Sequence, residues 1–146
     1  MSDGHAGGDA EIAEIASHLR TVIGQLVRRY RRDRTLPTSQ VSALVLIDND
    51  GPLTTSRLAA LEHVRPQSMA HTVGQLQDAG FIQRKPDPGD GRKVLLDLTP
   101  LGRATLAELR AEGEHWVSDA LAAGFTADER AELSRGIELL ARLAAE

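Results

Sequence analysis

The sequence predicts a mainly α-helical chain that carries one small antiparallel β hairpin. Apolar residues recur at three-and-four spacing through most of its 146 residues, which is the pattern of amphipathic helices. Between residues 81 and 99, two short β-rich segments flank a turn rich in proline and glycine. Because helix start and stop signals recur on both sides of these segments, we expect several helices rather than a single long one.

The first helix is expected from Ile12 to about Arg34. The glycine-rich opening, to about Asp9, is expected to be a frayed tail. The apolar stripe of the helix consists of Ile12, Ile15, Ala16, Leu19, Val22, Ile23, Leu26, Val27 and Tyr30. A stripe of this kind has to be buried against another surface.

Three shorter helices follow, expected at about residues 39–47, 57–62 and 66–79. Thr54, Thr55 and Ser56 offer N-cap hydroxyls to the second of them, and Pro66 suits the first turn of the third. Gly80 stands where a helix commonly ends in a left-handed residue. The two short helices around the tight turn at residues 63–65 predict a helix-turn-helix.

The hairpin comes directly after this helix-turn-helix. Its turn contains Pro86, Pro88, Gly89 and Gly91, and Val94, Leu96 and Leu98 alternate with Leu95 and Asp97 on the return strand. We expect Lys85, Arg92 and Lys93 at its tip. A strand, a charged turn and a strand after a helix-turn-helix predict a DNA-binding wing, so the fold is a winged helix-turn-helix.

Two long helices are predicted to close the chain. Thr99 is a suitable N-cap and Pro100 a suitable first residue for a helix that runs to about Ala122. Thr126 and Glu129 form a capping box for a last helix, from Ala127 to about Ala144.

Composition excludes several classes of function. The absence of cysteine excludes disulfides, thiolate metal sites and thiol-based redox sensing. No apolar run approaches the roughly 20 residues needed to span a bilayer, so we expect a cytoplasmic protein without membrane association. One Trp, one Tyr and two Phe are too few for the aromatic platforms that bind single strands, which leaves duplex DNA as the expected nucleic acid.

Catalytic and metal-binding signatures are missing. The chain contains no P-loop, no Gly-x-Ser-x-Gly elbow and no dinucleotide fingerprint. Its histidines show no close metal-ligand spacing; they are His5, His18, His63, His71 and His115. We therefore expect no enzyme, no cofactor and no metal site.

Net charge gives little support to DNA binding. The formal net charge is -4, and residues 53–98 carry six basic side chains against five acidic ones. Because phosphate contacts normally leave a basic surface, the prediction depends on where single residues lie.

The candidate DNA-contacting residues lie on the third short helix and on the wing. A helix in the major groove presents its N-terminal turns to base edges, which here hold Gln67, Ser68, His71 and Thr72, with Gln75 one turn further. Gln67 suits adenine, Ser68 and Thr72 suit phosphate or base, and His71 suits either. The alternative is an ordinary exposed polar face.

On the wing, Arg92 is the candidate for minor-groove contact, with Lys93 beside it. Asp90 is expected to organise the wing, by accepting a hydrogen bond either from Arg92 or from turn amides. The alternative is a surface ion pair worth at most about 1 kcal/mol.

Four segments in this order resemble the MarR (multiple antibiotic resistance regulator) family: Val64-Arg65-Pro66-Gln67-Ser68-Met69, Leu76 with Ala79-Gly80-Phe81-Ile82-Gln83-Arg84, Asp87-Pro88-Gly89-Asp90-Gly91-Arg92, and Leu98-Thr99-Pro100-Leu101-Gly102. Asp90 and Arg92 match the family's wing Asp-x-Arg, and Gln67 to Met69 match the start of its recognition helix. At Ala70 and His71 many members carry Thr and Arg, so the base preference is expected to differ.

The resemblance implies a homodimeric transcription regulator whose terminal helices interdigitate and which binds a palindromic operator. It further implies a repressor released by a small anionic or phenolic effector. On this basis residues 1–36 would be a tail and dimerisation helix, 37–99 the winged helix-turn-helix DNA-binding domain, and 100–146 the C-terminal dimerisation helices. The alternative function is a winged helix that serves as a protein-interaction module without specific DNA binding.

Overall fold

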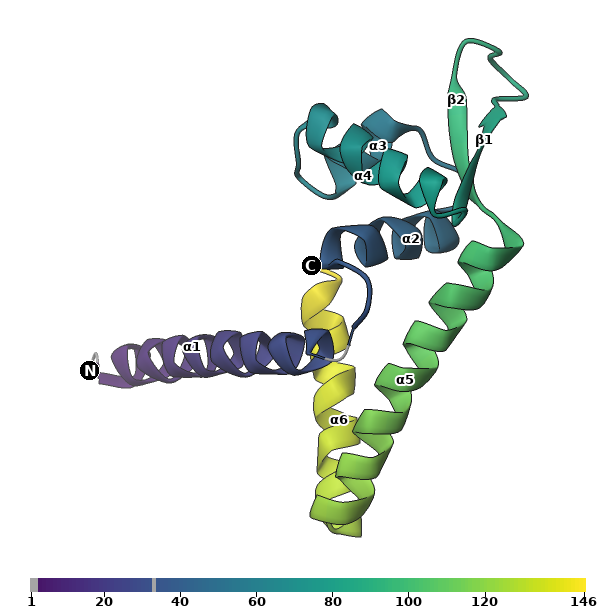
Figure 1. Cartoon of the computed structure of the whole chain (residues 1–146). Coiled ribbons are helices and arrows are strands. Elements are labelled where there is room, and N and C mark those ends of the chain that lie inside the picture. Colours follow the sequence, from purple (N-terminus) through teal and green to yellow (C-terminus); the bar gives the residue numbers. More distant parts are fainter. Residues whose placement is uncertain (1–2, 33) are drawn as a thin grey trace. The chain divides into compact units, whose positions relative to one another are not determined.

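The computed structural model describes residues 3–32 and 34–146. Within them lie six helices and two strands (Figure 1), namely α1 (Asp3–Arg31), α2 (Thr38–Asp50), α3 (Thr55–Leu61), α4 (Pro66–Asp78), β1 (Ile82–Pro86), β2 (Val94–Leu98), α5 (Pro100–Gly124) and α6 (Ala127–Ala144). The chain divides into two compact units, Met1–Gly102 and Arg103–Glu146. The predicted fold, mainly helical with one antiparallel hairpin, is confirmed.

The core of the first unit is built by α2, α3, α4 and the hairpin, which pack on one another in Figure 1. Its fully buried side chains include Leu44, Ile47, Leu58, Val73, Leu76 and Leu96. Each such side chain contributes about 1.5–3 kcal/mol relative to leaving it exposed. The predicted inward residues of α4, Met69, Val73 and Leu76, are all buried.

The hairpin pairs in the register from Ile82 opposite Leu98 to Pro86 opposite Val94. Only its base is buried, because Leu96 and Leu98 lie in the core whereas Val94 is 44% exposed. Leu53 adds an isolated bridge to β2, since it donates a hydrogen bond to the carbonyl of Leu96 (3.1 Å) and accepts one from its amide (2.7 Å). The sequence did not predict this bridge, because a single residue has no periodicity.

The junction between α4 and the hairpin is fixed by backbone hydrogen bonds. Gly80 has a φ of 79°, and the amides of Gly80 and Phe81 donate to the carbonyls of Gln77 (3.0 Å) and Leu76 (2.9 Å). These bonds complete the Schellman motif predicted by Gly80. Thr99 caps α5 as predicted, because its hydroxyl oxygen accepts a hydrogen bond from the Gly102 amide at 3.0 Å.

Helix bounds differ from expectation at several ends. The prediction of a frayed tail to Asp9 was wrong for the part the structure describes, since α1 begins at Asp3. Gly7 and Gly8 disfavour a helix by only about 1 kcal/mol each, so their presence does not exclude one. At its other end α1 stops at Arg31, before the predicted Arg34.

The ends of α2 and α5 also lie later than predicted. Helix α2 continues through the polar residues 48–50 and ends at Gly51, whose φ is 81°. Asp and Asn are common in turns, but the helix persists until a glycine permits the positive φ. Helix α5 continues to Gly124, two residues beyond the predicted Ala122.

The capping box of α6 is confirmed. The amide of Glu129 donates to the Thr126 hydroxyl oxygen (3.2 Å), and the amide of Thr126 donates to the Glu129 carboxylate (2.8 Å). None of the residues of α6, all of which the structure describes, is buried. Its exposed apolar side chains are Leu133, Ile137, Leu139, Leu140 and Leu143.

Helix α1 exposes a similar stripe, formed by Ile12, Ile15, Ile23, Leu26, Val27 and Tyr30. Across the described residues, none of the helices combines the length and the hydropathy that crossing a membrane requires.

Candidate nucleic-acid interface

The helix-turn-helix is formed by α3, a four-residue turn and α4. The Thr54 hydroxyl oxygen accepts a hydrogen bond from the Arg57 amide (3.1 Å), which caps α3 as predicted. In the turn, His63 has a φ of 53°, a conformation in which histidine is enriched among non-glycine residues. Arg65 is the N-cap of α4 and Pro66 its first residue.

Helix α4 presents a polar face to solvent. Gln67, Ser68, His71 and Gln75 are exposed on it. Successive members of the row Gln67, His71 and Gln75 stand four residues apart, so they follow one side of the helix. This row can approach a ligand without rearrangement of the core.

Thr72 differs from the other residues predicted on α4. It is only 8% exposed, and its hydroxyl donates a hydrogen bond to the Ser68 carbonyl at 3.2 Å. It follows Met69 by three residues and precedes Leu76 by four, which places it on the buried stripe. The prediction that Thr72 lies on the exposed contact face was therefore wrong.

Gln75 is tied to the neighbouring helix α2. The Nε2 of Gln40 donates a hydrogen bond to the Oε1 of Gln75 at 3.2 Å. Gln40 is 8% exposed, so its amide is largely withdrawn from water. A buried amide is costly unless it is hydrogen-bonded, and Gln75 supplies the partner.

The base of the hairpin is attached to α4 and braced across its strands. The Nε of Arg84 donates to the Oε1 of Gln77 at 2.8 Å, which links β1 to α4. The Nζ of Lys85 lies 2.8 Å from the Oδ2 of Asp97 on β2. The expectation that Lys85 lies at the tip was therefore wrong, because β1 extends through it.

The tip of the wing is held by short-range hydrogen bonds to two carboxylates. The Oδ1 of Asp90 accepts a hydrogen bond from the Arg92 amide (3.1 Å), and the Oδ1 of Asp87 accepts one from the Gly89 amide (2.8 Å). The amide of Asp87 donates to the Lys93 carbonyl at 3.0 Å and closes the turn. Of the two partners expected for Asp90, the structure shows a turn amide, which is that of Arg92 itself, and the Arg92 side chain is exposed.

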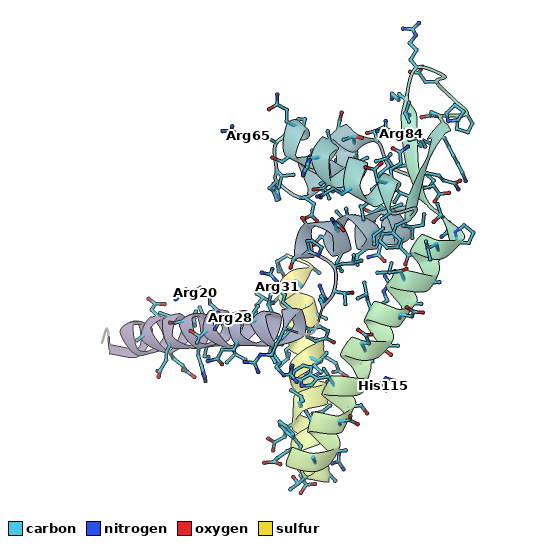
Figure 2. The ribbon with its side chains drawn as sticks, viewed as in Figure 1. Arg20, Arg28, Arg31, Arg65, Arg84 and His115 are labelled. Carbon is cyan, nitrogen blue, oxygen red and sulfur yellow. The ribbon has the colours of Figure 1, made fainter. Side chains whose placement is uncertain are left out.

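Two arginines that the sequence did not single out lie on the same unit. Arg65 is exposed at the start of α4, and Arg84 is exposed on strand β1 of the hairpin (Figure 2). Arg65 could have been found from its position immediately before Pro66, which is an N-cap position. Arg84 could have been found from the period-two pattern of the strand, which places it opposite Leu96.

The described residues hold no group of three or more His, Cys, Asp or Glu side chains that could bind a metal ion. The surface formed by α4 and the adjacent wing presents side-chain amides, a histidine and arginines. This arrangement suits the grooves and phosphates of a duplex.

Comparison with known proteins decides the family. The sequence model of the MarR family matches residues 36–94. An uncharacterised HTH-type transcriptional regulator of Mycobacterium leprae is 34% identical over 134 residues, which cover 90% of this chain and 93% of the relative. The chain belongs to the MarR family.

Two further comparisons extend over most of the chain. An HTH-type transcriptional repressor of Mycobacterium bovis is 35% identical over 107 residues, or 73% of this chain and 74% of the relative. The crystal structure of a putative transcriptional regulator of Pseudomonas aeruginosa is 32% identical, covers 94% of this chain and 97% of its own, and has a TM-score of 0.83. The chain is therefore a transcription regulator of the MarR family and not an enzyme.

Proposed function

We propose that this MarR regulator binds a specific duplex sequence with the exposed face of α4 and with the wing. Gln67, Ser68, His71 and Gln75 would contact the major groove, and Arg92 and Lys93 would contact the minor groove and its phosphates. The observation that supports this most directly is the wing tip, where the Asp90 carboxylate binds the Arg92 amide and thereby orders the turn that presents the Arg92 side chain. Arg65 and Arg84 add positive charge on the same unit.

We further propose a homodimer that binds a palindromic operator. The stripes of α1 and α6 are exposed in the single chain, with Ile15 60% and Leu143 60% accessible. Monomeric proteins rarely expose so many large apolar side chains in a row, so a second copy is the expected cover. Two symmetric lobes would place their recognition helices about one helical turn apart on DNA.

Repression and effector release complete the proposal. The name of the Mycobacterium bovis relative supports repression. An open surface pocket of about 220 Å³, between the end of α1 and the start of α2, is a candidate place for a small effector, since apolar Leu26 and Val27 line it together with Tyr30, Arg31, Arg34 and Thr38. Apolar walls suit a ring and arginines suit a carboxylate or phenolate, which is the predicted anionic or phenolic class.

The proposed division of labour follows the predicted boundaries. Residues 1–36 and 100–146 would form the dimer, and residues 37–99 would bind DNA. Because a regulator acts where the DNA lies, we place the protein in the cytoplasm.

The wing proposal is tested by the variant Arg92→Ala. Operators would be selected from a random duplex library and then titrated in mobility-shift assays. We expect Arg92→Ala to weaken operator binding by about 1–3 kcal/mol, or roughly five- to 150-fold, because the wing loses its minor-groove cation. Arg135→Ala, which removes an exposed arginine paired with Glu138 on α6, should bind like the parent. Unchanged affinity of Arg92→Ala would refute the role of the wing.

A salt titration of the parent separates DNA binding from the alternative of a protein-interaction module. The affinity of a DNA complex should fall steeply between 50 and 200 mM salt. The loss should be about 10³-fold or more if six or more phosphates are contacted. A hydrophobic protein interface would change little over the same range.

A further inference from the structure

We propose that Gln40, which lies behind the recognition helix, helps to set the base preference of this protein by fixing the amide of Gln75. The proposal deepens the DNA-binding function proposed above and rests on it. It concerns a positioning residue, because Gln40 would act only through Gln75.

The geometry joins a buried amide to an exposed one. Gln40 is on α2 and 8% exposed, and its Nε2 donates to the Oε1 of Gln75 at 3.2 Å. Gln75 lies on the exposed row that begins with Gln67 and His71. Since the Gln40 amide would lose a hydrogen bond in a largely dry position, the contact should persist when the outer face of α4 meets a ligand.

The contact makes the two ends of the Gln75 amide unequal. A glutamine that presents both its oxygen and its amino group can bind adenine in two places, by donating to N7 and accepting from N6. In this chain the Gln75 oxygen is turned toward Gln40, so the amino group is the end that is left for DNA. The amide should therefore act mainly as a donor.

A donor discriminates among base edges in the major groove. It matches the N7 of either purine, guanine O6 and thymine O4, whereas cytosine presents only its amino group and is mismatched. We therefore expect one position in each operator half-site at which cytosine is disfavoured by about three- to tenfold relative to the other bases, the range that a single hydrogen bond supplies.

The substitution Gln40→Glu offers a direct test. A carboxylate accepts hydrogen bonds but donates none, so Gln75 would have to turn its amino group inward and its oxygen toward the DNA. The preferred base at that position should then change to adenine or cytosine, whose amino groups are donors. Gln40→Met keeps a similar side-chain length without the amide, so the same preference should relax by about three- to tenfold without reversing.

The experiment compares operators selected from a random duplex library by the parent, Gln40→Met, Gln40→Glu and Gln75→Ala. Thermal unfolding of each variant shows that it is folded at the assay temperature. Gln75→Ala should lose the preference at the one position, and adding Gln40→Met to Gln75→Ala should cause no further change.

The outcomes separate this inference from the proposed function. If the parent selects no sequence, DNA-specific binding itself is wrong. If the parent selects an operator but both Gln40 variants keep its base preferences, only the role of Gln40 is overturned. A change caused by Gln40→Met in the Gln75→Ala background would also overturn it, because Gln40 would then act through the position of α4 and not through the amide.

Discussion

At the scale of single residues, Gly102 shows how closely the start of α5 approaches the hairpin. A Cβ built on Gly102 would overlap the carbonyl oxygen of Phe81, and its distance to the carbonyl carbon would be 2.9 Å. The same carbonyl oxygen accepts a hydrogen bond from the Thr99 amide at 3.0 Å, and the Thr99 hydroxyl donates to the neighbouring carbonyl of Gly80. The atoms that a Cβ at Gly102 would meet belong to the backbone of Phe81, so rotation of a side chain cannot relieve the overlap.

We predict that Gly102→Ala lowers the free energy of unfolding by about 1–3 kcal/mol, because the added methyl forces the backbone of Phe81 or of α5 to move. Chemical denaturation of the variant measures the change. Gly74→Ala is the matched control, since a Cβ at Gly74 meets nothing within 4 Å in this chain. It should raise stability by up to about 1 kcal/mol through helix propensity. Equal stability of the parent and Gly102→Ala would show that the approach is looser.

At the scale of elements, the wing is a hairpin stabilised at three levels. Its base is buried with Leu96 and Leu98, its strands are joined by Lys85 and Asp97, and its tip is ordered by Asp90. The ion pair is half exposed on the lysine side, so it contributes at most about 1 kcal/mol. The burial at the base therefore dominates stability, whereas the carboxylates shape the tip.

The role of Asp90 can be separated from its charge. Asp90→Ala and Asp90→Asn both remove a negative charge that would repel phosphate, but only the asparagine keeps an oxygen that accepts from the Arg92 amide. We predict that Asp90→Ala binds the operator about two- to tenfold more weakly than Asp90→Asn, the equivalent of one hydrogen bond. Mobility-shift titrations measure the ratio. Identical affinities would mean that the hydrogen bond does not organise the wing.

Elements with explicit end signals were predictable from the sequence. The Thr54 cap, the Gly80 motif and the Thr126 capping box were all found where their residue types require them. The burial of Thr72 and the contact between Gln40 and Gln75 were not predicted. A hydroxyl or amide has the same local preference on either side of a helix, and its partner 35 residues away in the chain leaves no local pattern.

At the scale of the whole molecule, the apolar stripes of α1 and α6 remain to be covered. Both stripes have the three-and-four spacing of an amphipathic helix, which can be seen in the sequence alone. The sequence does not identify the surface that covers them. Apolar spacing shows that a helix face must be buried, but it does not show against which surface. The same limit holds for the proposed effector, because its proposed pocket is lined by residues between Leu26 and Thr38 that meet only in the folded chain.

We predict that Ile137→Asp converts the proposed dimer to monomer. Ile137 is 56% exposed in the single chain, and burying a carboxylate there against a second copy would be unfavourable by several kcal/mol. Sedimentation velocity measures the oligomeric state. Arg135→Asn lies on the same helix and changes the net charge by the same amount, and it should remain dimeric. A dimer that survives Ile137→Asp would place the interface elsewhere.

The hydrogen bonds at the wing tip have a consequence for how regulators of this kind diversify. Among the described residues, Asp87 and Asp90 form their hydrogen bonds with residues between Gly89 and Lys93, so these bonds lie within the turn itself. The turn formed by residues 87–93 should therefore keep its structure when it is transferred to the hairpin of a related protein. Substitutions in this turn should leave the helices folded, so the proposed minor-groove contact could change independently of the surface that α4 presents.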